Sequence, residues 1–354
     1  TADGHYLLLE LHTKRRSLSS LTLHRHVGLG DVVGVGGNKV YYYDLCKFDG
    51  VYAESLGSCV KLIDTFRFSF IYISSIEDDF WFYTNYNAPR GRVVRVTLPS
   101  LNSHEDDVEE DGVRFTLLNA WKASLDWIPQ HPEDTLISAG IAAHTVLVLK
   151  YQKEHNHEVL LYDLTQNLVE ESQVPIATLP HPNHGTIIGP SSNFYSAEIF
   201  YQFSSLSDPS SVYRCLIDRD PFTGSVSISF HEVNATSLPN TDKYLYDTEV
   251  VNVPLPSSDT TAPPASQTPF SPSSGAPPAA TSPARTLPLL VFGRREVVEE
   301  AVYEGLPRPT LLLVYADQSF SYTPKFSLPL LLYAKHCRGL VCAVNLGHTG
   351  VSER

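Results

Sequence analysis

The stretch Ala197–Asp218, with the sequence AEIFYQFSSLSDPSSVYRCLID, constrains the fold more than any other part of the chain. Residues 198–203 and 212–217 alternate in character from one position to the next, which is the pattern of a strand whose successive side chains point to opposite faces. Between them, Ser207–Ser210 has the sequence Ser-Asp-Pro-Ser, a typical turn composition. The stretch therefore predicts a β-hairpin of an antiparallel sheet.

Similar short runs recur along most of the chain, separated by turn residues. They lie at 3–12, 38–45, 59–63, 69–74, 80–84, 93–98, 159–164, 225–233 and 244–251. No long helical period separates these runs. Regular short strands of this kind predict an all-β repeat architecture such as a β-propeller, in which each blade holds four strands in about 40 to 50 residues.

The identities within the hairpin point to a family. A strand E-I-F-Y-Q-F-x-S, a loop with S-x-P and a strand ending Y-x-C-x-x-D resemble the last propeller blade of the prolyl oligopeptidase family, serine peptidases that cut short peptides after proline. KLID at 61–64, FYTNYNAP at 82–89 and the passage Trp127–Tyr151 resemble the same family in the same order. The resemblance implies a partial β-propeller, the gating domain, over residues 1–250.

The remaining third of the chain has two different compositions. Residues 251–288 are rich in Pro, Ala, Ser and Thr, and they predict a disordered insertion or linker because they bury little apolar surface. Residues 289–354 contain apolar strands and a helical stretch, a pattern that favours an α/β sheet buried on both faces. YTPKFS and RGLVCAVN in this part resemble the first catalytic-domain elements of the family. We therefore expect a mainly β fold: a partial β-propeller followed by the first strands of an α/β-hydrolase domain that stops before its nucleophile.

Two site residues follow from the resemblance. It aligns Tyr315 with the family tyrosine whose hydroxyl helps to stabilise the oxyanion, although Val314, Ala316 and Asp317 replace the glycines expected around it. A packed structural tyrosine is the alternative role for Tyr315. Tyr86 stands where the family often carries an arginine that faces the central substrate cavity.

The catalytic triad is missing from these 354 residues. Acyl transfer on an α/β-hydrolase fold needs a G-x-S-x-G elbow, and the nearest match, Gly189–Asn193 in an expected propeller turn, lacks the second glycine. In the family, the nucleophile, acid and base follow the position at which this sequence ends, and the chain contains no methionine. We therefore expect an internal fragment, or a gene model without its start, that has no catalytic residue of its own and is inactive alone.

Other ligand sites are not predicted. The acidic stretch 103–112 is expected to be a solvated loop because it lacks calcium-ligand spacing. His155 and His157 are expected to be exposed on a hairpin tip rather than to bind a metal, and HEVNA at 231–235 lacks the second histidine of a zinc site. The glycine-rich end of residues 13–37 lacks the helix and Lys-Ser/Thr pair of a phosphate loop, so this segment is expected to be a flexible insertion. We expect no metal and no cofactor.

Composition restricts the partners and the compartment. The net charge of -13 and the pI near 5.5 argue against nucleic acid, and no apolar run reaches the length of about 18 residues that a membrane helix needs. Five scattered cysteines without C-x-x-C spacing favour reduced thiols. We expect a cytoplasmic monomer that does not bind nucleic acid or membranes.

Three functions are consistent with the sequence. The first is a serine endopeptidase or oligopeptidase whose propeller admits only short proline-containing peptides, as the family resemblance implies. The second is a non-catalytic propeller that acts as a binding module or pseudoenzyme. The third is a relative that cyclises peptides by transferring the acyl group to an internal amine. A G-x-S-x-G elbow encoded downstream of Arg354 would separate the first from the second.

Overall fold

The structure is a computed structural model that describes most of the chain in two compact units. The described residues are 1, 5–12, 20–23, 30–31, 37–45, 59–98, 107–110, 113–117, 125–153, 155–165, 174–182, 184–239, 241–254, 286–315 and 322–345. The first unit comprises Thr1–Thr241, Asp317–Ser327 and Gly347–Arg354, and the second comprises Asp242–Ala316 and Leu328–Leu346. Each unit is considered separately below.

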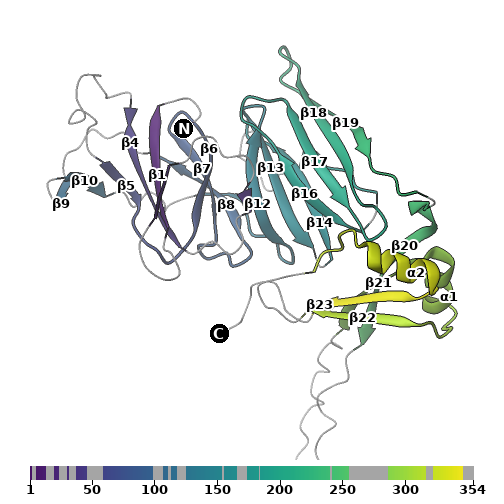
Figure 1. The fold of residues 1–354 in the computed structure, drawn as a ribbon. Helices are drawn as coiled ribbons and strands as arrows, with labels where there is room; N and C mark the ends of the chain where they lie inside the picture. The colour runs from purple at the N-terminus through teal and green to yellow at the C-terminus, as the bar shows by residue number, and fades with distance from the viewer. Residues whose placement is uncertain are drawn as a thin grey trace, which may run out of the picture. The chain divides into compact units, whose positions relative to one another are not determined.

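The first unit contains four sheets, which we call blades one to four in chain order (Figure 1). Blade one has the order β2-β1-β4-β5-β10-β9, and blade two has the order β11-β8-β7-β6. The strands of these two blades are β1 Tyr6–His12, β2 Ser20–Leu23, β4 Asn38–Asp44, β5 Cys59–Ile63, β6 Phe70–Ile76, β7 Asp79–Thr84, β8 Arg92–Thr97, β9 Asp107–Glu110, β10 Val113–Leu117 and β11 Leu125–Ile128.

Blade three has the order β15-β14-β13-β12-β3, and blade four has the order β16-β17-β18-β19. Their strands are β3 Gly30–Asp31, β12 Thr135–Ala142, β13 Val146–Lys153, β14 Asn156–Asp163, β15 Ala177–Thr178, β16 Thr186–Ser191, β17 Glu198–Ser204, β18 Ser211–Arg219 and β19 Val226–Ala235. The predicted hairpin is confirmed: β17 pairs antiparallel with β18 from Glu198↔Leu216 to Phe203↔Ser211.

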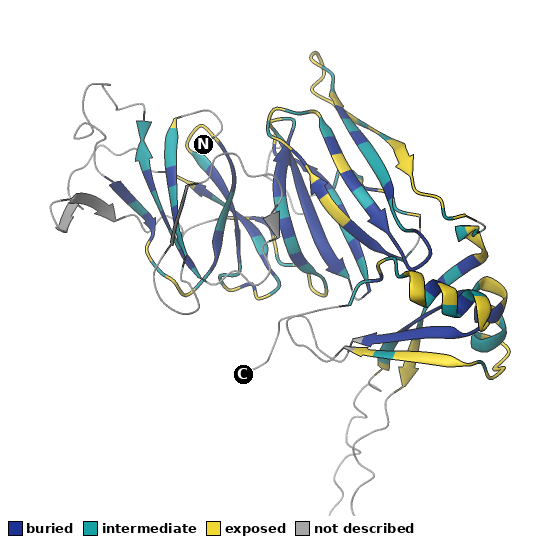
Figure 2. Ribbon diagram, in the orientation of Figure 1, coloured by how far each residue is buried: buried dark blue, intermediate teal, exposed yellow. Residues whose placement is uncertain are grey.

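Successive blades pack face to face through three hydrophobic clusters. Blades one and two share a cluster that includes Tyr42 and Phe80, blades two and three share one that includes Trp127 and Leu147, and blades three and four share one that includes Tyr201. The central strands β7 of blade two and β13 and β14 of blade three therefore have apolar residues on both faces, and β13 and β14 are largely buried (Figure 2). Short, mainly antiparallel sheets stacked in this way form the partial β-propeller that the sequence predicts.

One glycine is required by the packing of blade two. Gly91 lies in the turn between β7 and β8 with a φ of +80°, and a Cβ atom there would lie 2.5 Å from the ring of Tyr83. Only glycine combines this backbone conformation with so close an approach. The turn is closed by a 2.8 Å hydrogen bond from Gly91 N–H to the carbonyl of Ala88.

Several local expectations differ from the structure. The predicted acidic loop contains β9, which pairs with β10, and the predicted insertion at 13–37 contributes β2 to blade one and β3 to blade three. The remaining residues of that insertion, apart from Gly37, lie outside the described residues. Gly189–Ser191 belongs to the end of β16 rather than to a turn, and the strand is irregular there. Whether these segments form strands depends on backbone pairing with a neighbouring strand, which cannot be inferred from local composition.

The second unit is a mixed four-stranded sheet with two helices. Its order is β20-β21-β23-β22, in which β22 pairs parallel with β23 and the other neighbours are antiparallel. The elements are β20 Tyr246–Pro254, β21 Thr286–Arg294, α1 Arg295–Val302, β22 Thr310–Tyr315, α2 Leu328–His336 and β23 Leu340–Asn345. Residues 290–293 of β21 and 340–344 of β23 are buried, as the apolar runs predict, whereas β22 is largely exposed although its run is equally apolar.

The boundaries of the second unit differ from those drawn from composition. The two units divide between Thr241 and Asp242, whereas the sequence suggested a boundary after residue 250. The ends of the predicted linker are strand, because β20 and β21 pair out to Pro254↔Thr286. Residues 255–285 of that linker lie outside the described part of the chain.

Candidate functional site

A buried histidine lies where blades three and four meet. His157 on β14 has its Nδ1 atom 3.1 Å from the carbonyl oxygen of Ile187 on β16, and its Nε2 atom 2.9 Å from Oε1 of Gln152 on β13. Nε2 of Gln152 donates to the carbonyls of Lys153 and Asn156. The amide of Gln152 is thereby held with its oxygen toward the imidazole. This network ties the hairpin of β13 and β14 to the first strand of blade four.

The environment of His157 favours the neutral imidazole. Burial, with further contributions from the positive charges of Lys150 and Lys325, lowers its pKa to about 3, although the Ile187 carbonyl acts in the opposite direction. A neutral imidazole donates only one hydrogen bond at a time, either to Ile187 or to Gln152. A pKa this far below 7 is poorly matched to proton transfer at neutral pH, which gives His157 a structural role.

An ion pair joins the same two blades. Nη2 of Arg219, the last residue of β18, donates to Oδ1 of Asp163 at 2.8 Å and to Oγ1 of Thr145 at 2.9 Å. Burial alone would raise the pKa of Asp163, but hydrogen bonds from Arg219 and Thr165 outweigh it and lower the pKa. The side chain of Asp163 is 5% exposed, so Arg219 compensates a charge that is nearly removed from solvent.

Blades one and two are joined by a buried amide. Asn38 at the start of β4 donates from Nδ2 to the carbonyl of Phe70 and accepts from the Phe70 N–H through Oδ1, both at 2.6 Å. Asn38 is fully buried, so both of its polar atoms need these partners. Glu10 on β1 also accepts from the N–H of Tyr72 at 3.1 Å. Side chains of blade one thus complete hydrogen bonds of the first strand of blade two.

The structure places Tyr86 in an aromatic cluster at the end of blade two. Its ring packs edge-on against Phe68 with centroids 4.8 Å apart, and it lies 6.4 Å from the ring of Phe70. The guanidinium of Arg92 lies over the Tyr86 ring at 5.8 Å. Tyr86 is half-buried, and part of its ring is therefore accessible from solvent.

Tyr315 is the last residue of β22, where its backbone pairs with Asn345 of β23. Its side chain, together with Ala316 and Asp317, lies outside the described residues. Tyr86 and Tyr315 belong to different units, so each is considered only within its own unit. The role predicted for each tyrosine stays a prediction.

The expectation that His155 and His157 are exposed is wrong. They are 2% and 7% exposed, because β13 and β14 continue almost to the tip and only two residues join them. His157 is a strand residue that faces blade four. Among the residues that the structure describes, no group of three or more His, Cys, Asp or Glu side chains has the arrangement of a metal site.

Comparison with known proteins identifies the first unit. The model of the prolyl oligopeptidase N-terminal β-propeller domain matches residues 1–224. The chain belongs to the prolyl oligopeptidase family. All strands of the four blades except β19 lie within the matched region, whereas β19 and the mixed sheet of the second unit lie beyond it.

Solved structures of prolyl oligopeptidases share the fold at low sequence identity. Prolyl oligopeptidase B from Galerina marginata, bound to a 25-residue macrocyclization substrate, matches with a TM-score of 0.61 and 15% identity over 99% of this chain and 37% of its own. Its apo form gives a TM-score of 0.59 at 14% identity, with the same coverage of both chains. One of two prolyl endopeptidases analysed for inter-domain dynamics gives 0.54 and 18% identity, over 98% of this chain and 37% of that one. The chain therefore spans little more than a third of these prolyl oligopeptidases.

The residues that join the blades of this prolyl oligopeptidase propeller were missed by sequence reasoning. His157 and Gln152 are separated by a turn, and Arg219 and Asp163 are 56 residues apart, so neither pair forms a motif. One signal was present: Lys150, Gln152 and His157 interrupt otherwise apolar alternation on two adjacent strands. Polar residues at core positions indicate a buried network, because an unpaired polar group is costly there.

Proposed function

We propose that this chain is the gating part of a serine peptidase of the prolyl oligopeptidase type, which cleaves short peptides after proline. The observation that carries this proposal is the propeller itself, whose four blades, apart from β19, lie within the family match over residues 1–224. In this function the propeller excludes large substrates by its size and keeps water away from the reaction. The substrates would be short proline-containing peptides, and the protein would act as a monomer in the cytoplasm.

The second unit supports a hydrolase assignment. We propose that its sheet is the opening of an α/β-hydrolase domain, in which Tyr315 at the end of β22 helps to stabilise the oxyanion. The sheet pairs β22 and β23 in parallel and carries a helix in each of the segments that precede β22 and β23. β22 exposes Leu312 and Val314, which are 56% and 52% exposed (Figure 2). An apolar face of this kind on a parallel strand is typical of a sheet whose faces are covered by helices.

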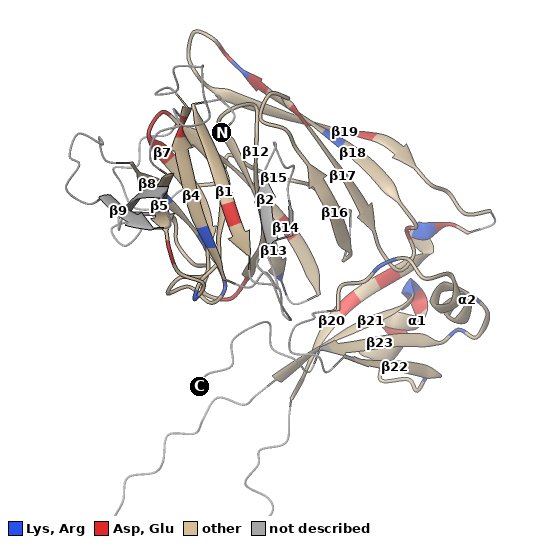
Figure 3. Cartoon of the chain, turned by 60° about the vertical axis from the view of Figure 1, so that its left-hand side comes forward, with Lys and Arg blue, Asp and Glu red and all other residues tan. Residues whose placement is uncertain are grey.

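The proposed cytoplasmic location, a reducing compartment, is supported by the cysteines. Among the described residues, Cys59, Cys215, Cys337 and Cys342 are all free thiols. Burial raises the pKa of Cys215 to about 12 and also raises that of Cys342, so these thiols are unreactive. Separately, none of the described helices has the length and apolar composition needed to cross a membrane. Acidic and basic residues both occur on the strands, turns and helices (Figure 3).

A non-catalytic binding module is the second candidate. It is favoured by the sequence, because Val314, Ala316 and Asp317 surround Tyr315 in place of glycines and a stretch rich in Pro, Ala, Ser and Thr occupies residues 251–288. In that case the propeller would bind proline-containing peptides without cleaving them. Binding of a labelled proline peptide to the chain, measured by fluorescence anisotropy, would support this candidate.

A peptidase assay tests whether the chain lacks a catalytic nucleophile of its own. Purified residues 1–354 should not turn over a fluorogenic Gly-Pro reporter peptide, because the chain supplies no activated serine. The matched control is a Gly-Ala reporter, whose hydrolysis would reveal a contaminating peptidase. Turnover specific to the proline reporter and abolished by a serine-directed reagent would show that the proposed absence of a nucleophile is mistaken.

A further inference from the structure

A short segment between β22 and α2 belongs to the propeller unit rather than to the unit of its neighbours in sequence. Residues 322–327, with the sequence YTPKFS, group with blades one to four, whereas β22 and α2 belong to the second unit. In Figure 1 this segment is the yellow coil that leads into α2. Pro324 is buried, which is unusual for a residue in a connection without helix or strand.

Two hydrogen bonds hold this segment on blade four. Oγ1 of Thr186 donates to the carbonyl oxygen of Pro324 at 2.8 Å, and the N–H of Phe326 donates to Oγ of Ser204 at 3.1 Å. Thr186 is the first residue of β16 and Ser204 the last of β17, and the two are 2% and 4% exposed. The contact is therefore made by hydroxyls that are otherwise removed from solvent.

The spacing of the Thr186 and Ser204 hydroxyls matches the spacing of the backbone groups that they contact in the segment. Thr186 and Ser204 are directly opposite in the antiparallel pair of β16 and β17, so their side chains point to the same face. In an extended chain, a carbonyl and the N–H two residues later also point to the same side. Proline at 324 disfavours a helical conformation of Thr323 and leaves no N–H of its own to satisfy. The sequence T-P-x-F thus presents one acceptor and one donor to two adjacent hydroxyls.

Release of the segment would leave polar groups unpaired. Thr186 Oγ1 would lose its donation to Pro324, whereas Ser204 Oγ also donates to the carbonyl of Asp208 at 3.1 Å and would keep that bond. A buried hydroxyl or carbonyl without a partner is costly unless water replaces the lost contact. Thr186 is therefore the more specific determinant of docking, since it has no second role in the turn.

We propose that residues 322–327 form a strap that docks on blade four through the Thr186 and Ser204 hydroxyls, so that a segment that follows β22 in the sequence is part of the propeller unit. Ser327 is followed directly by Leu328, the first residue of α2, so the strap ends where this helix begins. The inference concerns the docking of the strap and does not depend on the peptidase reaction.

Residue-resolved hydrogen exchange on the 354-residue chain tests this proposal. In the unmodified chain, the Phe326 amide should be protected although it lies outside helices and strands. Thr186→Val should speed exchange of Phe326 about tenfold and leave residues 205–211 unchanged, because valine keeps the shape of threonine and removes only the donor. Ser204→Ala should speed exchange of Phe326 and of the 205–211 turn together.

Thr135→Val is the matched control. The Oγ1 atom of Thr135 is buried without a hydrogen-bond partner among the described residues, so its removal should not change strap exchange. Exchange of β13 and β14 reports whether each variant remains folded. An unprotected Phe326 amide in the unmodified chain would overturn the proposal. Equal Phe326 exchange in folded Thr186→Val and in the unmodified chain would do so as well.

Discussion

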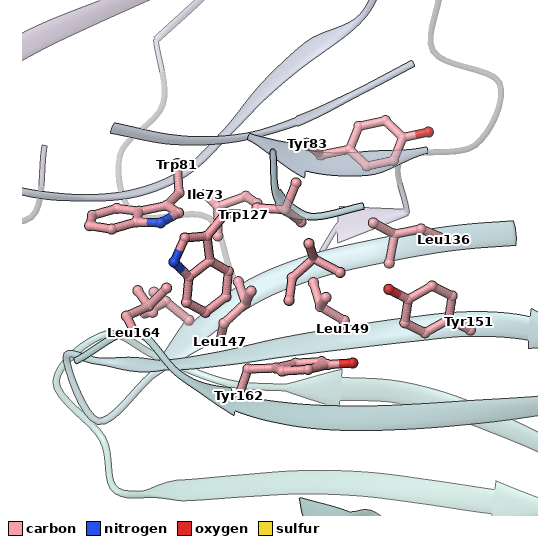
Figure 4. Close-up of a cluster of buried hydrophobic side chains, with 13 residues drawn as sticks. Ile73, Trp81, Tyr83, Trp127, Leu136, Leu147, Leu149, Tyr151, Tyr162 and Leu164 are labelled. Carbon is pink, nitrogen blue, oxygen red and sulfur yellow. The ribbon is translucent and has the colours of Figure 1, made fainter. Parts of the chain in front are cut away.

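Two junctions of the propeller are built in different ways. Between blades two and three, apolar and aromatic side chains such as Trp81, Trp127 and Leu147 fill the interface (Figure 4). The Nε1 atoms of both tryptophans have no hydrogen-bond partner among the described residues. Between blades three and four, a comparable apolar cluster is accompanied by the His157 network and the Arg219–Asp163 pair.

The difference separates two ways of joining blades. An apolar junction gains stability in proportion to the surface it removes from water, and it does not depend on pH. A polar junction gains less net free energy, but each hydrogen bond fixes one relative position of the blades. We therefore expect loss of an apolar side chain from the first junction to have the largest effect on stability, and the polar contacts of the second junction to make stability depend on protonation.

The largest effect is expected from the apolar junction. Leu147 is fully buried on β13, and Leu147→Ala should lower the free energy of unfolding by about 2–5 kcal/mol because it removes apolar contacts and leaves a cavity. Denaturant titration followed by tryptophan fluorescence measures this change. Val233→Ala on β19, where the side chain is 56% exposed, should change stability by less than about 0.5 kcal/mol. Similar losses in both variants would contradict the view that burial in this junction makes a large contribution to stability.

The pH dependence of stability should come from the polar junction. The pKa of His157 is about 3 in the folded chain and about 6.5 when unfolded, so below pH 6.5 the unfolded state takes up the proton first. The free energy of unfolding should therefore fall by about 2–3 kcal/mol between pH 6.5 and 4.5. The readout is urea titration at several pH values.

His157→Gln removes the titrating group and should flatten that pH dependence, whatever its effect on stability at pH 7. Parallel pH curves for this variant and the unmodified chain would show that another group is responsible. Asp163 does not cause the same pH dependence. Its pKa is lowered in the folded chain, so its contribution to the free energy of unfolding is lost only as the pH falls below about 4.

The smallest of the three effects is expected from the ion pair. Arg219→Ala leaves the buried Asp163 carboxylate without its main partner and should cost about 1–3 kcal/mol. Arg214→Ala is the matched control on the same strand, since its pair with Glu198 is more exposed and should contribute less than about 1 kcal/mol. Thermal melting of the two variants compares them directly. Equal losses would mean that burial of Asp163 has no energetic consequence.

Sequence reasoning predicted the strands well because each signal is local. The hairpin at 197–218 and the runs at 38–45 and 59–63 alternate or end at turn residues, and the structure confirms them as strands. Sequence reasoning failed at His157, because this histidine is near a hairpin tip and is buried only by its packing against the neighbouring blade. It also missed β9, since charged residues in an edge hairpin resemble a solvated loop.

Local sequence patterns were enough to predict the repeated antiparallel strands, the family and the change of composition after residue 250, because alternation, turn residues and motif identities act over a few positions. The tertiary structure alone decided which strands join which sheet, such as β3 in blade three and β10 beside β5. It also decided which polar residues are buried and where residues 322–327 dock. These features depend on partners that are tens to more than a hundred residues away, and no local pattern encodes such distances.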